Sequence, residues 1–348
     1  MPPLPGPWRS ILDEARLYPS PHNSQPIKVR VLDECRAEFF YDLDLGLPAE
    51  NFGIPFGHVC AGVFLEALST VAAGHGFTVS ETLRGDDLDF AAADRHQSLG
   101  TLALGPTEVT AAARDQLVAF RRRRTSRRPY DRTLVGPAVL DEVTAIAASM
   151  GQSFGHSAAV PLVAELIRIN QQTLFDDLRN DAVHAEILAW IRTSKRRAAA
   201  TGDGLSAETM LLPGPLLDFA MRHRGLWELP VLGAVFRRAY LATMRGVRQL
   251  GWLTGPFDNP LDYIEAGRCF LRIWLAFTRH DVYLHPFGTV VTNPRSHAAF
   301  VEAAGVAEGD GRLAWMLFRF GHSKPPPLAL RRELDAMLLD LDTAGGPA

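Results

Sequence analysis

The chain has 348 residues, 47% of them hydrophobic and 22% charged, so it is long enough for one large or two ordinary globular domains. The formal net charge of −3 gives no support for a general nucleic-acid-binding role, and every long apolar stretch is interrupted by a charge, so no membrane span is predicted. We expect neither nucleic acid nor membrane among its partners.

The first residues form neither a basic nor an apolar run, so no signal peptide is expected. Three widely separated cysteines favour a reducing compartment, and we expect a cytoplasmic protein. None of the 11 histidines stands at a metal-ligand spacing from another histidine or a cysteine, so no metal site is predicted.

The amino-terminal part of the chain predicts an α+β unit of roughly a hundred residues. Its apolar spacing predicts a helix, a strand hairpin, a long helix buried on most sides and a further strand. We expect these elements at residues 8–17, 28–32 and 37–41, 56–75, and 99–104.

Residues 18–26, between the first helix and the first strand, form a stiff polar turn. Proline fixes φ and pushes the residue before it out of the helical region. Ser20, Asn23 and Gln25 therefore hold donors and acceptors on a rigid bend, where they are free to face a ligand. On composition alone, such a stretch is more often a plain turn than a binding site.

A helix expected at 111–120 leads into residues 121–130, six of which are arginine. Such a run predicts a solvated linker between two units or a nucleic-acid patch. Phosphate binding needs only two or three of these side chains, and arginine suits it because its planar group makes bidentate contacts to phosphate oxygens. A continuous run cannot face one way on a helix, so part of it is ordinary surface.

The carboxyl-terminal part predicts further helices, an apolar insertion and a last strand. We expect helices at 137–150, 159–195, 260–280 and 295–304, and a strand buried on both faces at 312–320. Residues 201–256 are rich in Leu, Gly and Pro and show no clean period, so they either cover a site or form an interface. We interpret them as a largely helical lid, whose large side chains line a substrate pocket: Met210, Phe219, Trp227 and Trp252.

The two long helices can be aligned without a gap at an offset of 205 residues, which places Gly62 on Gly267. Each helix is followed, after a spacer, by a strand. This weak internal repeat predicts two related halves, which we place at residues 1–115 and 116–348.

Three separated motifs resemble those of the FMN-dependent nitroreductase family. They are Pro-Ser-x-x-Asn-x-Gln-Pro at 19–26, Arg-Arg-Thr-x-Arg at 123–127, and an ending that runs from Arg319-x-Gly through Pro325 to paired arginines at 331 and 332. In that family the first motif contacts the flavin, the second holds the FMN phosphate, and an arginine at the end closes over the phosphate. The resemblance implies an FMN site made of Pro19, Ser20, Asn23, Gln25, Arg123, Arg124, Thr125, Arg127 and Arg331, with Pro286 and Gly288 near the reactive edge of the flavin.

Members of that family are homodimers with FMN at the subunit interface. Here the first half supplies the Pro-Ser-x-x-Asn loop, and the second half supplies the arginine motif and the ending. The resemblance therefore implies an α+β fold of tandem nitroreductase-like half-domains, fused into an intramolecular pseudo-dimer with one complete FMN site. It is similar to the two-domain branch called Acg-like in actinobacteria. We expect a monomer or a homodimer of such pseudo-dimers.

The chain departs from the family pattern at Ile27, where Trp is common, at Asp281, where Gly is expected, and in the insertion 201–256. The resemblance implies an FMN-dependent oxidoreductase with a restricted, lid-covered site for a specific small organic substrate. The alternatives are a reductase of nitro compounds or quinones that uses NAD(P)H as hydride donor, and a non-catalytic protein that sequesters FMN. His22 is the candidate catalytic proton donor, although a hydrogen-bonded loop histidine is the commoner role.

Overall fold

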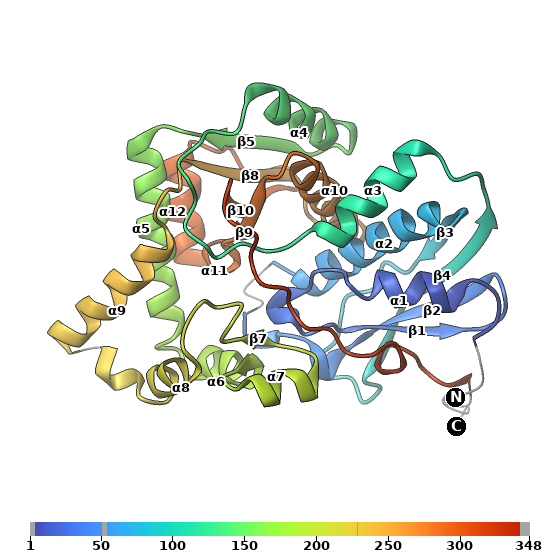
Figure 1. The fold of residues 1–348 in the computed structure, drawn as a ribbon, viewed down its shortest axis with the longest axis horizontal. Helices are drawn as coiled ribbons and strands as arrows, with labels where there is room; N and C mark the ends of the chain where they lie inside the picture. Colours follow the sequence, from blue (N-terminus) through green and yellow to red (C-terminus); the bar gives the residue numbers. More distant parts are fainter. Residues whose placement is uncertain (1–3, 51–53, 228, 342–348) are drawn as a thin grey trace.

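The computed structural model describes residues 4–50, 54–227 and 229–341, and confirms an α+β fold built from two related halves (Figure 1). The first half contains α1 (Trp8–Ala15), β1 (Ile27–Val31), β2 (Arg36–Asp42), α2 (Phe56–Gly74), β3 (Phe77–Leu83) and β4 (His96–Pro106). Helix α3 (Ala111–Arg122) leads to the second half, which contains α4 (Pro137–Ser149), β5 (Ser153–Ser157), β8 (Gln249–Pro256), α10 (Pro260–Arg279), β9 (Tyr283–Pro286), α11 (Gly288–Thr292), α12 (Pro294–Ala304) and β10 (Arg312–Gly321).

The two antiparallel sheets have the same connectivity. The strand order is β1-β2-β4-β3 in the first sheet and β5-β8-β10-β9 in the second, so the strands correspond one to one in chain order. In each sheet the register shifts by one residue between the two central strands, where Leu99 on β4 and Trp315 on β10 are the extra residues. Because a bulge is a local and specific feature, its recurrence at the same place supports a structural repeat.

Helices α2 and α10 cross where each has a glycine. A Cβ on Gly62 would lie 1.8 Å from the carbonyl oxygen of Ile264, and a Cβ on Gly267 would lie 2.0 Å from that of Val59. The 205-residue offset that pairs the two glycines also pairs Val59 with Ile264. The contact is therefore reciprocal, as at the two-fold interface of a homodimer.

Helix α2 lies at the centre of a core that is continuous between the halves. By length and composition it could cross a membrane, but 72% of its apolar window is buried inside the protein. Its bounds, Phe56–Gly74, confirm the helix predicted at 56–75. A helix that is apolar nearly all round is expected in the core of a protein of this size.

An insertion at residues 158–248 separates β5 from β8, where the first half has only a short turn between β1 and β2. It holds α5 (Val160–Asp177), α6 (Asp181–Trp190), β6 (Ile191–Arg192), α7 (Lys195–Thr201), β7 (Leu205–Ser206), α8 (Gly214–Arg222) and α9 (Pro230–Thr243). The predicted boundaries, 201–256, are therefore wrong. Residues 249–256 form a central strand of the second sheet, and a strand buried along its whole length shows no alternation that would reveal it.

Two other predicted elements need correction. The helix expected at 159–195 is divided, because the side chain of Asn180 accepts hydrogen bonds from the backbone N–H groups of Ala182 and Val183 and starts a new helix there. Strand β3 was not predicted. It is an edge strand with Thr78, Ser80 and Thr82 on its exposed face, and this polar composition resembles that of a loop.

The carboxyl-terminal tail returns from the second half to the first (Figure 1). The backbone N–H of Val29 donates to the carbonyl oxygen of Met337, and the N–H of Leu339 donates to that of Val29, both at 2.9 Å. The tail thus adds to the free edge of β1. This crossing brings Arg331 and Arg332 beside the polar turn that follows α1.

Candidate functional site

The polar turn after α1 has an unusual backbone. His22, Asn23 and Gln25 have φ of 47°, 57° and 57°, in the left-handed region that residues other than glycine rarely occupy. Ser20 fixes the bend, because its Oγ accepts the backbone N–H of Gln25 at 2.9 Å. Strained backbone of this kind collects at ligand-binding and active sites.

The side chains of Asn23 and Gln25 reach across to the insertion and the tail. Asn23 Nδ2 donates to the carbonyl oxygen of Gly204 at 3.2 Å, and Gln25 Nε2 donates to that of Gly202 at 3.0 Å. Gln25 Oε1 accepts the backbone N–H of Arg332 at 3.0 Å. These contacts close the turn against the insertion. The contact of the two amides with a flavin stays a prediction.

Two guanidinium groups from distant parts of the chain converge on this turn. Arg123 Nη2 and Arg331 Nη2 both donate to the carbonyl oxygen of Leu17, at 3.2 and 3.3 Å. Arg123 is only 8% exposed, and its guanidinium carbon lies 4.6 Å from the ring centroid of Trp274 in α10. The Nε atoms of both arginines are buried without a hydrogen-bond partner.

The electrostatics of this pair indicate an anion site. Burial, with the nearby charge of Arg331, lowers the pKa of Arg123 to about 9, and burial lowers that of Arg331 to about 10. Neither side chain forms an ion pair with a carboxylate in the part of the chain that the structure describes. Buried cations are costly unless they are paired and hydrogen-bonded, so an anion between them would stabilise the protein.

The middle of the arginine motif runs along the edge of the second sheet. Thr125 forms a bridge with Leu284 of β9, and Arg124 Nη1 donates to the carbonyl oxygen of Pro326 at 3.1 Å. The Nε of Arg124 is also buried without a hydrogen-bond partner. The motif is thus held between the sheet edge and the proline-rich ending.

Half-buried Arg127 belongs to a second cluster, with Arg319 of β10 and the half-buried His285 of β9. Arg319 is fully buried and donates to the carbonyl oxygens of Ser126 at 3.1 Å and Thr243 at 2.6 Å. Burial and the charge of Arg319 lower the pKa of Arg127 to about 10, and no hydrogen bond or ion pair holds its side chain within the described residues. Burial and both arginines lower the pKa of His285 far below its ordinary value, so this imidazole is neutral at physiological pH.

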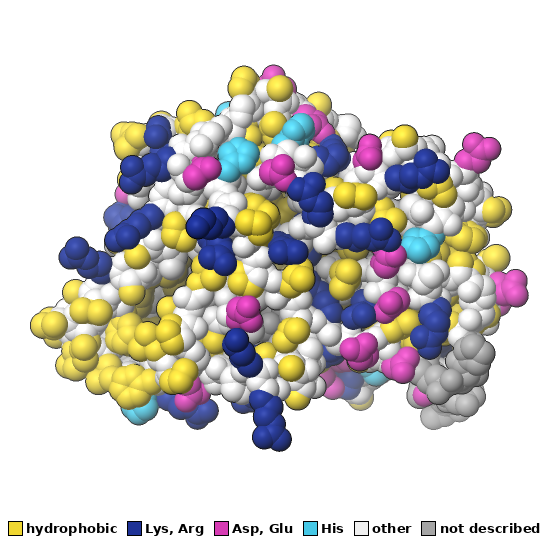
Figure 2. All heavy atoms as spheres, in the orientation of Figure 1, with side chains coloured by type: hydrophobic (Ala, Val, Ile, Leu, Met, Phe, Trp, Pro, Cys, Tyr) yellow, Lys and Arg dark blue, Asp and Glu magenta, His cyan; other side chains and the backbone are white. Residues whose placement is uncertain are grey.

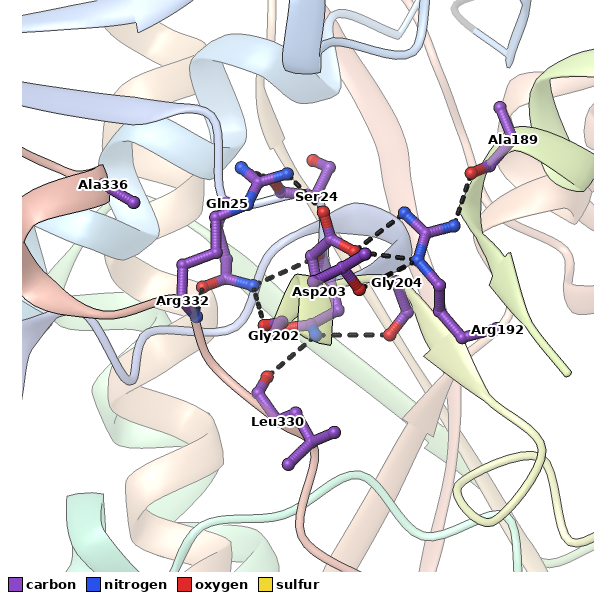
Figure 3. A network of polar contacts seen from close by, with 12 residues as sticks. Ser24, Gln25, Ala189, Arg192, Gly202, Asp203, Gly204, Leu330, Arg332 and Ala336 are labelled. Carbon is purple, nitrogen blue, oxygen red and sulfur yellow. Dashed lines mark hydrogen bonds and ion pairs between the residues drawn. The ribbon is translucent and has the colours of Figure 1, made fainter. Parts of the chain in front are cut away.

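Arg332 ties the turn to the insertion through an ion triad (Figure 3). Asp203 lies 2.7 Å from Arg192 Nη2 and also pairs with Arg332 Nη2, while Arg332 Nη1 donates to the carbonyl oxygen of Ser24 at 3.1 Å. Burial alone would raise the pKa of Asp203. Hydrogen bonds from Thr201, Arg332 and Arg192 outweigh it and hold that pKa below its ordinary value.

The close approach of the insertion depends on the glycines on either side of Asp203. Gly202 and Gly204 have φ of 63° and 74°, and a Cβ on them would lie 2.7 Å from the carbonyl oxygen of Arg331 and 2.4 Å from that of Trp190. Only glycine combines this conformation with this space. The Gly-Asp-Gly segment 202–204 therefore fits against the tail and the turn in a defined position.

The remaining predicted site residues lie around these groups. Pro19 is half-buried in the turn, and His22 lies in a short 3₁₀ helix (Pro21–Asn23). Pro286 ends β9 and Gly288 begins α11. A Cβ on Gly288 would lie 3.7 Å from the ring of Phe56, at the start of α2, so this turn faces the first half. The catalytic role of His22 and the position of the turn relative to a flavin stay predictions.

The four predicted pocket residues do not meet in one place. Trp252 is buried in β8 against Phe300, and Phe219 is 48% exposed on α8. Met210 and Trp227 pack around the small core of the insertion. The prediction that these four residues line one pocket is therefore wrong. Apolar character alone does not show whether a side chain lies in the core, on the surface or in a cavity.

Asp203 and Arg192 were not recognised from the sequence, and Arg319 was noted only as the first residue of the third motif, without a role of its own. The Gly-Asp-Gly triplet at 202–204 is a turn signal that could have drawn attention to Asp203, and an arginine inside an apolar strand is unusual enough to mark Arg319. No sequence signal marks Arg192. Within the described ranges, no group of three or more His, Cys, Asp or Glu side chains could hold a metal ion.

No protein-family model and no curated protein matches the chain. Among solved structures, a nitroreductase with bound FMN from Bacteroides fragilis is 12% identical, with a TM-score of 0.38 over 67% of this chain and 98% of its own. The FMN-dependent nitroreductase NfnB from Mycobacterium smegmatis, in complex with NADPH, is 14% identical, with a TM-score of 0.39 over 65% and 97%. A nitroreductase-like family protein from Bacillus cereus is 11% identical, with a TM-score of 0.35 over 68% and 100%. These TM-scores lie below 0.5, so the likeness by itself indicates no function for this chain.

Proposed function

We propose that the chain is an FMN-dependent oxidoreductase of the nitroreductase type, with one flavin site between the two halves. The pair Arg123 and Arg331 carries this proposal. Both guanidinium groups converge on one carbonyl oxygen, both keep a buried Nε without a partner, and neither is neutralised by a carboxylate among the described residues. The phosphate of FMN would neutralise both cations and accept their hydrogen bonds.

The residues present fit the cofactor. Arg123, Arg124, Thr125 and Arg331 are assigned to its phosphate. Arg127, from the same segment, supplies a further cation, with no hydrogen bond or ion pair to its side chain among the described residues. FMN, when bound, supplies the redox chemistry. The protein binds and orients it, and the insertion excludes water by closing on the turn that carries Asn23 and Gln25.

We infer a selective site that takes one small organic substrate. The support is the contact between the turn and residues 202–204, which brings the insertion onto the two side chains that we propose contact the flavin, Asn23 and Gln25. A non-catalytic protein that sequesters FMN is the second candidate, and the same closure favours it. The remaining alternative is a broad reductase of nitro compounds or quinones, which would use NAD(P)H as hydride donor.

The first test is whether the protein binds FMN, and how many FMN molecules each chain holds. Purified protein, reconstituted with FMN if necessary, should be yellow and release one FMN per chain on heating. One site is expected because only three residues separate α4 from β5, whereas eleven separate α1 from β1 and form the polar turn. A protein that stays colourless contradicts the proposal, and two FMN per chain contradict the single site.

The second test separates the candidates. NADPH or NADH is added anaerobically to the yellow protein, followed by a panel of nitroaromatics and quinones. Fast turnover of the whole panel favours the broad reductase. Turnover of few or none of the compounds, with a flavin that chemical reductants still reduce, favours the selective site. A flavin that is neither reduced nor released favours sequestration.

A further inference from the structure

The insertion carries an exposed apolar surface that none of the described residues covers. Eight large side chains of α8, α9 and their flanking residues are between 37% and 75% exposed: Leu212, Leu216, Phe219, Leu229, Val231, Leu232, Val235 and Leu241. We refer to these eight residues as the α8–α9 face. Figure 2 shows hydrophobic side chains gathered at the lower left of the molecule, where Figure 1 places α8 and α9. Soluble proteins rarely expose so many large apolar side chains together unless they bind something.

The charges around this face are mostly positive. Residues 212–248 contain six arginines and two carboxylates, although the whole chain has a net charge of −3. Arg222 and Arg224 are paired with carboxylates. Arg238 and Arg245 are exposed, and the structure gives them no ion pair within its described residues. The basic charge is therefore local and partly free to meet an anionic partner.

Charge complementarity distinguishes the partners that could cover this face. In a two-fold dimer formed through α8 and α9, the patch meets its own copy, so both partners bring the same excess of arginine to the interface and neither supplies the carboxylates to neutralise it. A surface of anionic lipids complements both features, since its acyl chains accept Leu, Val and Phe side chains and its headgroups attract arginine. Apolar side chains flanked by basic residues on one helix face are the pattern of interfacial membrane binding.

We propose that the α8–α9 face docks the protein on an anionic lipid surface, with its apolar side chains at the boundary between headgroups and acyl chains. The chain lies on the bilayer and does not cross it. The proposal departs from the expectation of no membrane partner, which rested on the lack of a spanning segment. It does not depend on the proposed redox function, because it concerns a different face of the insertion.

The test is co-sedimentation of the full chain with vesicles of phosphatidylcholine, with or without phosphatidylglycerol. We expect binding to the anionic vesicles and at least tenfold weaker binding to the neutral ones. Val231→Glu with Val235→Glu should abolish binding. Arg238→Gln with Arg245→Gln should weaken it more than tenfold, because each arginine near an anionic surface strengthens binding roughly fivefold.

Matched controls change the same residue types at other exposed positions. Val118→Glu with Val160→Glu, and Arg114→Gln with Arg312→Gln, should bind like the original protein. Circular dichroism checks that each variant is folded. If the Val→Glu substitutions prevent folding, the variant with Arg238→Gln and Arg245→Gln serves as the test. Absence of binding to anionic vesicles overturns the proposal. So does equal loss in the controls, or a dimer in sedimentation velocity that the Val231→Glu, Val235→Glu variant dissociates.

Discussion

Arg123 and Arg331 show how single residues indicate a ligand before any ligand is seen. A guanidinium group keeps its charge at neutral pH, so burial does not neutralise it and instead lowers its pKa, to about 9 for Arg123 and about 10 for Arg331. A structural arginine in such a position is normally paired with a carboxylate, as Arg192 is with Asp203. Within the described residues this pair has no such partner, and this is why we propose a bound anion here.

Removing either cation should therefore weaken FMN binding without lowering the stability of the FMN-free protein. Arg123→Ala or Arg331→Ala should weaken FMN binding roughly ten- to a hundredfold, because a charge-assisted contact is worth on the order of 1.5–3 kcal/mol. The melting temperature without FMN should not fall, since a poorly compensated buried charge is removed. Arg121→Ala is the control, because Arg121 pairs with Glu14 on the surface. Fluorescence titration with FMN measures the effect, and equal weakening at 121 and 123 would favour a diffuse basic patch.

Asp203 should make stability depend on pH. Its pKa is held below the ordinary value, so the folded state binds fewer protons than the unfolded state. The resulting stabilisation is complete above about pH 4, the unfolded pKa, and is lost as the pH falls through the folded pKa. The original protein should therefore exceed Asp203→Asn in free energy of unfolding at neutral pH, and the difference should vanish in acid. Urea unfolding over a pH series measures this, with Asp218→Asn, an exposed pair with Arg222, as the control.

At the scale of elements, the insertion has two separate surfaces. Its Gly-Asp-Gly segment reaches inward to the polar turn, while α8 and α9 project away from the core and expose apolar side chains. The inward contact joins three parts of the chain that are far apart in sequence: the turn after α1, the insertion and the tail. A change in any of them should affect how closely the insertion covers the site.

Weakening the inward contact should open the site. Asp203→Ala removes the pairing with Arg192 and Arg332, and it should raise the turnover of nitroaromatics and quinones by roughly tenfold or more if closure limits access. The measurement is steady-state kinetics with NADPH on protein that still holds FMN. Asp218→Ala, on the same insertion, should leave turnover unchanged. If the original protein already turns over the panel quickly and Asp203→Ala does not increase the rate, the insertion is not a gate.

At the scale of the whole molecule, the chain reproduces within itself the geometry of a homodimer. Two sheets of identical connectivity, with a bulge in the same place, are joined by α2 and α10 in a reciprocal contact. The symmetry is broken twice, because the first half keeps the polar turn and the second half carries the insertion. This asymmetry is the physical reason why we expect one site where a symmetric dimer has two.

The helix crossing should be the most sensitive point of this arrangement. Gly62→Ala or Gly267→Ala forces the backbones apart and should lower the free energy of unfolding by about 1–3 kcal/mol or more. This outweighs the gain of about 0.5–1 kcal/mol that alanine gives in a helix. Gly85→Ala is the control, since a Cβ there meets nothing within 4 Å. Urea unfolding should show similar losses for the two crossing variants, and no loss at either position would contradict the reciprocal contact.

Local patterns in the sequence were enough to predict the class of fold and two related halves, while the residues of the flavin site stay a prediction. Long apolar helices such as α2 and α10 are specified locally, and the alignment placed Gly62 on Gly267, the two glycines that the structure places at the crossing. The proline-fixed turn and the arginine run were also visible, because proline geometry and charge are properties of neighbouring residues. Strand β8 was hidden, since a strand buried on both faces has no alternation.

Folding brings together groups that the sequence leaves unconnected. The run 121–130 contains six arginines, and local sequence gives little reason to assign them different roles. In the folded protein, Arg121 pairs with Glu14 at the surface, whereas Arg123 is buried beside Arg331. Trp252 and Phe219 look alike as large apolar residues, yet one lies in the core and the other on the surface. The physical reason is that burial and ion pairing depend on contacts between segments far apart in the chain. Such contacts are set by the packing of the whole molecule and not by local sequence.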